Sequence, residues 1–142
     1  MKFYIGTDHA GLDLKNYTKE LLEARGHEVV DLGPYNKDRV DYPDYAKKVS
    51  ASVLGDEGAQ GVLICGTGIG MSLTANKFKG IRAALCTDAY TARMAREHND
   101  ANVLCFGERV VGYGVAESII DSWLASSFEG GRHAGRVAKI ED

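Results

Sequence analysis

The sequence has few of the residues that cross-link small secreted domains or build metal ribbons. Only three of its 142 residues are cysteine and only two are proline. The cysteines, Cys65, Cys86 and Cys105, are an odd number and form no CxxC pair. This pattern argues against a disulfide framework, a zinc ribbon and a thiol redox module. Since each cysteine stands at or near the end of an apolar run, we expect two of the three to be buried core residues.

Long apolar runs and a strong excess of one charge are also absent. No run approaches the roughly 20 apolar residues of a membrane-spanning helix, and the N-terminus has no signal-peptide pattern. The formal net charge is -3, with 26% of the residues charged, which gives no electrostatic reason to expect nucleic-acid binding. We therefore expect a cytoplasmic protein that binds neither membranes nor nucleic acid.

Short apolar runs alternate with amphipathic segments along the chain. The expected strands cover residues 2–7, 27–33, 61–66, 81–87 and 101–107. The expected helices cover residues 12–24, 45–54, 69–78, 89–98 and 111–124. Because right-handed crossovers join parallel strands, this alternation predicts an α/β fold: a Rossmann-like three-layer α/β/α sandwich with a five-stranded, mainly parallel sheet. The length suits a single domain over residues 1–142.

Two segments outside these elements have a distinct composition. Residues 33–43 are rich in turn formers and predict a surface loop. From about residue 129 the chain is basic and rich in glycine, which argues against a place in the core. Arg132 and Arg136 stand four residues apart on either side of His133, a spacing that suits a phosphate if the segment is helical. A solvated basic tail is the alternative.

The stretch LICGTGIGMSLTANK, residues 63–77, places a thiol at the start of a glycine loop. Glycines at alternate positions, Gly66, Gly68 and Gly70, let backbone N–H groups turn inward, and the next helix presents its positive end. Such a loop favours the thiolate form of Cys65. Two interpretations stay open: a nucleophile or general base beside an oxyanion-stabilising loop, or a strand-end cysteine packed under a tight turn.

Ligands of open parallel sheets bind at the carboxyl ends of the strands. We therefore expect the polar and glycine residues near the strand ends to gather at a single edge of the sheet. These residues are Asp8, His9, Gly11, Tyr42, Asp44, Cys65, Thr67, Gly68, Gly70, Thr87, Asp88, His98, Asn99, Gly107 and Arg109. Structural roles compete for several of them: Asp8 can cap a helix, His98 can favour the negative end of one, and Tyr42 can anchor a loop.

Two classes of function fit this layout. In an isomerase, a general base removes a proton next to a carbonyl, the loop stabilises the enediolate, and arginines hold a phosphate. In a nucleotide-binding module, GTGIG would hold a pyrophosphate and Asp88, 22 residues after Gly66, would bind a ribose hydroxyl. Against the second class, the loop reads GxGxG instead of GxGxxG, follows the third strand, and begins with a thiol that a nucleotide would not need.

Five stretches, GTDHAG, DYPDYA, ICGTGIGMSLTANK, REHNDANVLCFGERVVG and FEGGRHAGR, resemble ribose-5-phosphate isomerase B. That family also holds galactose-6-phosphate isomerase subunits and allose-6-phosphate isomerases. The resemblance runs from about residue 2 to 140, with the motifs in the family order. It implies an aldose-ketose isomerase without cofactor or metal that interconverts ribose 5-phosphate and ribulose 5-phosphate. The active form would be a homodimer or dimer of dimers with sites at the subunit interface.

The resemblance also implies roles for individual residues. Cys65 matches the base that moves the proton between C2 and C1, with Thr67 placing the substrate beside it. His98 matches the group that opens the furanose ring. The loop that stabilises the enediolate corresponds to Gly66, Gly68, Ile69 and Gly70; the sugar contacts to Asp8, Tyr42 and Asn99; and the phosphate contacts to His9, Arg109, Arg132 and Arg136. Allose 6-phosphate and galactose 6-phosphate stay alternative substrates.

Overall fold

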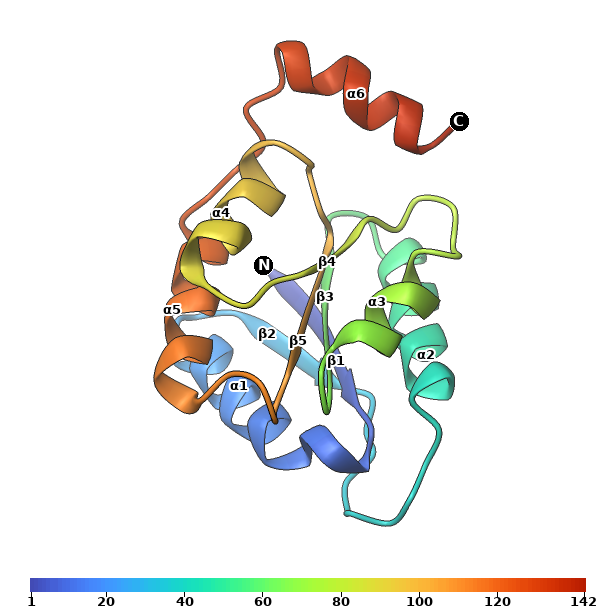
Figure 1. The fold of residues 1–142 in the computed structure, drawn as a ribbon, viewed down its shortest axis with the longest axis vertical. Helices are drawn as coiled ribbons and strands as arrows, with labels where there is room; N and C mark the ends of the chain where they lie inside the picture. The colour runs from blue at the N-terminus through green and yellow to red at the C-terminus, as the bar shows by residue number, and fades with distance from the viewer.

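The computed structural model describes residues 1–142 and contains one five-stranded sheet (Figure 1). Its strands are β1 (Lys2–Thr7), β2 (Glu28–Asp31), β3 (Gln60–Cys65), β4 (Ala83–Leu85) and β5 (Val103–Gly107). All neighbouring strands are parallel, in the order β2-β1-β3-β5-β4. The predicted Rossmann-like α/β fold is therefore confirmed.

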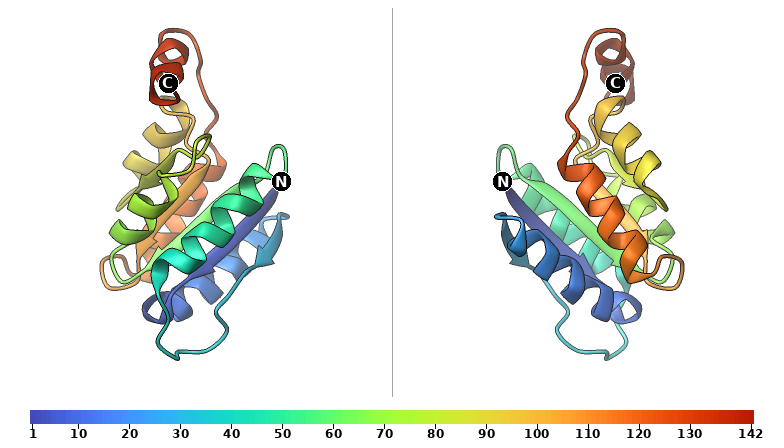
Figure 2. Two further views of the ribbon diagram at one scale, coloured as in Figure 1. Left: turned by 90° about the vertical axis from the view of Figure 1, so that its right-hand side faces the viewer. Right: turned by 90° about the vertical axis from the view of Figure 1, so that its left-hand side faces the viewer.

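Helices cover both faces of the sheet, as parallel crossovers require. They are α1 (Leu12–Ala24), α2 (Tyr42–Leu54), α3 (Ile69–Ala75), α4 (Ala89–Glu97), α5 (Tyr113–Leu124) and α6 (Arg132–Ile140). Helices α1, α4 and α5 pack on one face, whereas α2 and α3 pack on the other (Figure 2). Helix α6 projects beyond the sheet, past the end of α4 (Figures 1 and 2). None of the helices is long and apolar enough to cross a membrane.

The alternation of side chains along β3 divides the core into two layers. Val62 and Ile64 join the cluster under α1, α4 and α5, whereas Leu63 and Cys65 join the cluster under α2 and α3. Every residue of β3 is buried, because this strand lies in the middle of the sheet with helices on both faces. Its last residue is Cys65, so the core holds the backbone of this cysteine firmly in place.

Two expectations about local structure need correction. Helix α2 begins at Tyr42, not at residue 45, because Asp41 takes the N-cap position and Pro43 fits the first turn. Tyr42 therefore begins a helix instead of ending a strand. The C-terminal tail is a helix, and His133 on it is buried, although the basic, glycine-rich composition argued against any core contact. Gly130 and Gly131 both have positive φ and turn the chain so that α6 can pack back.

Candidate active site

A pocket of about 440 Å³ opens at the carboxyl ends of β1 and β3. These strands are neighbours, and the strand order reverses between them, since β2 lies outside β1 while β5 and β4 lie beyond β3. Such a reversal leaves a crevice where open α/β sheets bind ligands. The pocket is lined by Asp8, His9, Ala10, Tyr42, Cys65, Gly66, Thr67, Ile69, Gly70, Leu73 and Arg109. The structure thus brings most of the expected site residues together.

The loop after β3 directs one backbone amide toward the thiol and another toward the hydroxyl of Thr67. The amide N–H of Gly68 donates to Sγ of Cys65 at 3.0 Å, and the amide of Ile69 donates to Oγ1 of Thr67 at 3.1 Å. Gly68 has φ 83°, and a Cβ at this position would lie 2.8 Å from the Phe106 backbone. Only glycine meets both requirements, so the loop geometry is fixed by this residue. An N–H group facing sulfur stabilises negative charge there.

The three cysteines differ in what surrounds them. Cys86 and Cys105 lie in the core. Burial raises the pKa of Cys86 to about 11 and that of Cys105 well above its ordinary value. Cys65 is also buried, but it lines the pocket. It is therefore the thiol that a ligand in the pocket can meet.

Asp8 and His9 follow β1 and begin the short 3-10 helix η1 (His9–Gly11). Asp8 caps this turn, because its Oδ1 accepts from the amide of Ala10 at 2.9 Å. Nδ1 of His9 accepts from the amide of Val40 at 3.2 Å, a bond from the loop that leads to α2. With Nδ1 acting as the acceptor, Nε2 of the neutral ring carries the proton. His9 can thus offer an N–H donor to an anion in the pocket.

Tyr42 and Arg109 form further walls of the pocket. A Cβ on Gly70 would overlap the ring of Tyr42, so glycine permits this close packing. Arg109 follows β5, and its amide donates to the carbonyl of Gly66 at 3.0 Å. The Arg109 guanidinium also lies close to Gly66, since a Cβ there would be 3.4 Å from Nη1. A fixed positive charge therefore stands beside the glycine loop.

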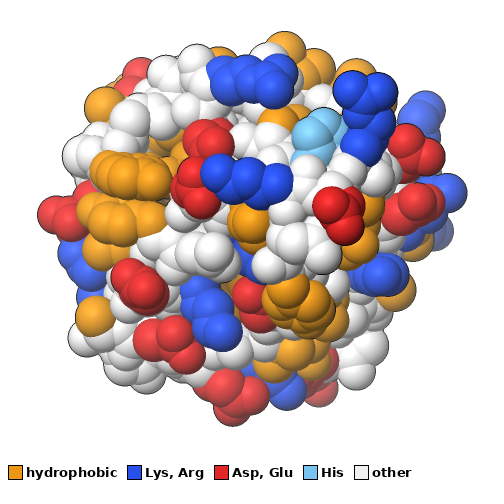
Figure 3. All heavy atoms as spheres, turned by 90° about the horizontal axis from the view of Figure 1, so that it is seen from below, with side chains coloured by type: hydrophobic (Ala, Val, Ile, Leu, Met, Phe, Trp, Pro, Cys, Tyr) orange, Lys and Arg blue, Asp and Glu red, His pale blue; other side chains and the backbone are white.

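Figure 3 views this side of the molecule, from below the fold of Figure 1. Lysine, arginine and acidic side chains alternate there, and a histidine side chain stands among basic groups (Figure 3). The surface is hence not a broad basic face of the kind that binds a nucleic-acid backbone.

Four expected site residues lie at the opposite edge of the sheet. His98 caps the C-terminus of α4 and Asn99 follows it, so both precede β5 and stand at its amino end. Arg132 and Arg136 are exposed on α6, which projects at that same end (Figure 1). The prediction that His98 and Asn99 share one edge of the sheet with Cys65 is therefore wrong within one chain. A residue before a parallel strand and a residue after it are separated by the strand's length.

His98 has two neighbours that sequence reasoning did not assign. Its ring stacks on His133 with centroids 4.2 Å apart, and its Nε2 lies 3.4 Å from Oε1 of Glu129. Burial, followed by the positive charges of His98 and Arg132, lowers the pKa of His133. Glu129 lies before α6, so the turn at Gly130 and Gly131 brings it to His133, and no helical spacing in the sequence could signal their contact.

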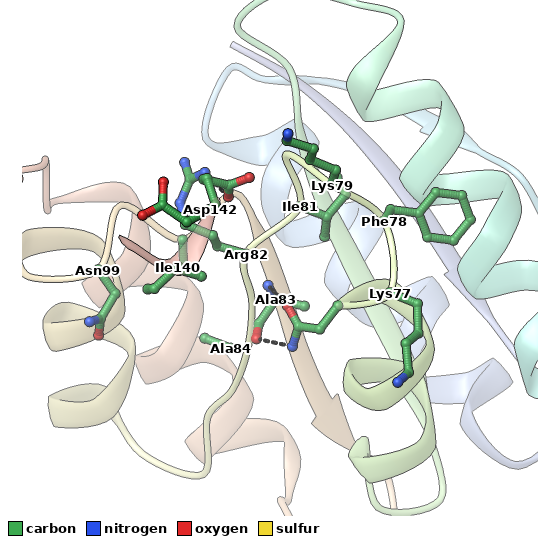
Figure 4. Close-up of a pocket in the computed structure, with 13 residues that line it drawn as sticks. Lys77, Phe78, Lys79, Ile81, Arg82, Ala83, Ala84, Asn99, Ile140 and Asp142 are labelled. Carbon is green, nitrogen blue, oxygen red and sulfur yellow. Dashed lines mark hydrogen bonds and ion pairs between the residues drawn. The ribbon is translucent and has the colours of Figure 1, made fainter. Parts of the chain in front are cut away.

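A second cavity, of about 650 Å³, lies beside α6 at the amino end of the sheet (Figure 4). Its lining includes Arg82, Asn99 and Ile140. Glu141 closes one side, because its carboxylate accepts from Nη1 of Arg82 at 2.9 Å and from the amide of Gly80 at 2.8 Å. Sequence patterns did not predict this cavity, since it depends on where α6 folds back.

The arrangement argues against the nucleotide-binding alternative. Asp88, the expected ribose ligand, caps α4 instead: its Oδ1 accepts from the amide of Thr91 at 2.7 Å and from the Thr91 hydroxyl at 2.8 Å. The glycine loop follows β3, whereas the dinucleotide fingerprint follows the first strand. Both observations favour the interpretation in which the loop GTGIG acts together with the Cys65 thiol over the one in which it binds a pyrophosphate.

Comparison with known proteins agrees with this geometry. The family model described as Ribose/Galactose Isomerase matches residues 3–140. The chain belongs to this family. Ribose-5-phosphate isomerase B of Escherichia coli is 50% identical over 139 residues, which are 98% of this chain and 93% of the relative. The family expected from the five motifs is thus confirmed.

Solved structures of this isomerase family share the whole fold. Ribose-5-phosphate isomerase B of Clostridium thermocellum is 54% identical with a TM-score of 0.97, covering 99% of this chain and 95% of that one. The Mycoplasma genitalium protein, solved with bound ribulose-5-phosphate, is 44% identical with a TM-score of 0.94, covering 99% and 93%. The structural similarity therefore covers the whole chain, from β1 to α6.

Proposed function

We propose that this chain interconverts D-ribose 5-phosphate and D-ribulose 5-phosphate without a cofactor, through an enediolate. The observation that carries the proposal is the Cys65 thiol at the pocket, with the amide of Gly68 donating to its sulfur. Two relatives named for this activity, from Escherichia coli and Listeria innocua, are 50% and 43% identical. Because the match to this chain covers more than nine tenths of the length of each relative, the activity is proposed for the whole chain.

The chemistry follows from the pocket. The Cys65 thiolate removes the proton from C2 of the open-chain aldose, which leaves an enediolate, and the resulting thiol returns the proton to C1. The hydroxyl proton on O2 passes to O1 in the same conversion, so that the carbonyl moves from C1 to C2. Backbone N–H groups of the loop at 66–70 stabilise the negative charge on the oxygen. Asp8 accepts from sugar hydroxyls, and Thr67 holds the substrate beside the sulfur. His9 and Arg109, which both line the pocket, donate to the phosphate.

We infer that the complete site needs two chains. His98, Asn99, Arg132 and Arg136 stand at the amino edge of the sheet, away from the Cys65 pocket. A homodimer with a twofold axis can bring this edge of one chain to the pocket of its partner, and it does so twice. The partner's histidine would then open the sugar ring, and its arginines would complete the phosphate contacts. Such dimers can pair further into a dimer of dimers.

Two finer assignments stay predictions: one isomerase domain over residues 1–142 with its C-terminal segment from about 129, and a cytoplasmic location. The competing substrates are six-carbon sugar phosphates, because the family description names galactose as well as ribose. Allose 6-phosphate and galactose 6-phosphate each have one carbon more than the five-carbon substrate and so need a deeper pocket, and galactose 6-phosphate differs from it in hydroxyl configuration as well.

The deciding experiment is proton NMR of the purified protein with ribose 5-phosphate in deuterated buffer containing EDTA. We expect ribulose 5-phosphate to form and solvent deuterium to enter next to the carbonyl. A Cys65→Ala variant is the matched control and should do neither. No conversion and no exchange by folded wild-type protein would refute the proposal, and turnover of allose 6-phosphate alone would assign the six-carbon substrate instead.

A further inference from the structure

Three side chains with metal-ligand chemistry meet where α6 folds back on α4. This histidine cluster consists of His98, Glu129 and His133, whose ligand atoms all lie within 4.8 Å of one another. Oε1 of Glu129 stands between the two rings, 3.4 Å from Nε2 of His98 and 3.6 Å from Nε2 of His133. Imidazole nitrogens with one carboxylate oxygen are a ligand set typical of zinc.

A second observation points to a missing ligand. The His133 side chain is only 8% exposed, and its Nε2 is buried without a hydrogen-bond partner. A buried polar atom left in this way costs free energy, and such atoms are rare in folded proteins. Because this nitrogen faces the Glu129 carboxylate and the His98 ring, whatever satisfies it must enter the cluster. A cation bound by all three side chains would enter the cluster and satisfy the Nε2 atom of His133.

We propose that the histidine cluster binds a divalent transition-metal cation of the zinc class and that this cation inhibits the isomerase. Ligand atoms of a tetrahedral zinc site are about 3.4 Å apart, which the two contacts of Glu129 already approach. The two rings are nearly parallel, with 15° between their planes, so the His98 ring must tilt to share the ion. Its side chain is 36% exposed and has room to move. The fourth position stays open for water.

The inhibition rests on the proposed function, whereas the binding does not. His98 is the residue assigned to opening the sugar ring. A cation bound to its ring nitrogen takes the lone pair that this proton transfer needs. Ring opening would fail, while the Cys65 thiol that the partner chain supplies to the shared site is not among the three ligands and stays free. The metal thus acts on one step of the reaction and leaves the carbon-acid step intact.

The binding is tested by equilibrium dialysis with Zn²⁺ and by the visible absorption of Co²⁺, on the full-length protein. We expect one ion per chain in the wild type, and affinity weaker by more than about tenfold in Glu129→Gln and His133→Phe. His27→Gln removes a histidine on another part of the chain and should bind as the wild type does. Glu129 is half exposed, so Glu129→Gln should fold even if His133→Phe does not. Unchanged affinity in Glu129→Gln would overturn the proposal.

The inhibition is tested with two substrates. Zn²⁺ should stop turnover of ribose 5-phosphate, and EDTA should restore it. Deuterium entry into ribulose 5-phosphate, which enters as an open chain, should continue. Glu129→Gln should resist the metal; equal inhibition of this variant would place the metal on the Cys65 thiol and overturn the proposal. If the protein turned over no pentose phosphate at all, the dialysis result would still decide the metal site.

Discussion

Gly68 donates its amide N–H to Sγ of Cys65 at 3.0 Å, and the same glycine is the N-cap of α3 in a left-handed conformation, with φ 83°. Thiol and amide are held by different parts of the fold, since Cys65 ends the buried strand β3 and Gly68 packs on the backbone of Phe106. The hydrogen bond is therefore preorganised before any substrate arrives. An amide in this position can stabilise a thiolate and the oxyanion that the thiolate creates.

Replacing Cys65 with alanine should remove the isomerase activity while the protein stays folded. A positioned general base contributes roughly 10²–10⁴-fold to such a reaction, so kcat should fall by about this factor or more. The measurement is the rate of ribulose 5-phosphate formation, with circular dichroism to check the fold. Cys86→Ala is the control, because Cys86 lies outside the pocket and should keep most of its activity. Full activity in Cys65→Ala would exclude the thiol as the base.

Gly68→Ala should lower both stability and activity. Gly58→Ala is the control that separates backbone strain at positive φ from the steric clash of a new side chain. Both glycines have φ near 83°, but a Cβ on Gly58 meets nothing within 4 Å, whereas one on Gly68 meets the Phe106 backbone. Urea unfolding should show a loss of about 1 kcal/mol for Gly58→Ala, from strain alone. Gly68→Ala should lose more and should also lower kcat. Equal losses of stability, with activity kept, would mean that the loop tolerates a side chain.

Alkaline pH should weaken the fold through Cys86. Its pKa in the folded protein is about 11, above the reference value of 9.0, because burial disfavours the thiolate. Between these two values the unfolded chain loses the thiol proton while the native chain keeps it, so stability falls as the pH rises. The loss should reach at most about 2–3 kcal/mol by pH 11. Unfolding of wild type and Cys86→Ala between pH 8 and 11 measures it, and parallel curves would contradict the assignment.

A mixture of two inactive variants should recover activity if each site is shared between chains. Cys65→Ala damages the pocket, and His98→Asn damages the opposite edge of the sheet. In a mixed dimer, one site carries both changes and the other carries neither. With random exchange of chains, half of the dimers are mixed and half of their sites are intact, so about one quarter of the wild-type activity should return. No recovery after subunit exchange, verified by native mass spectrometry, would place the whole site within one chain.

The sequence alone determined the order and type of the elements from β1 to α5, but not helix α6. Apolar runs such as residues 61–66 and amphipathic segments such as 12–24 report burial through short-range periodicity, and this signal does not depend on distant contacts. The glycine loop was also recognisable, because left-handed turns need glycine wherever they occur. Five separate sequence motifs were enough to indicate the isomerase family.

Only the tertiary structure decided which residues lie close together in space. The periodicity of a strand does not reveal which residues of other segments lie near its amino end and which lie near its carboxyl end. His98 was therefore expected beside Cys65 but lies at the opposite edge of the sheet. Composition likewise placed His133 in solvent, whereas the turn at Gly130 and Gly131 buries it against His98. Both outcomes depend on how crossovers and turns fold the chain in three dimensions, and local patterns do not carry that information.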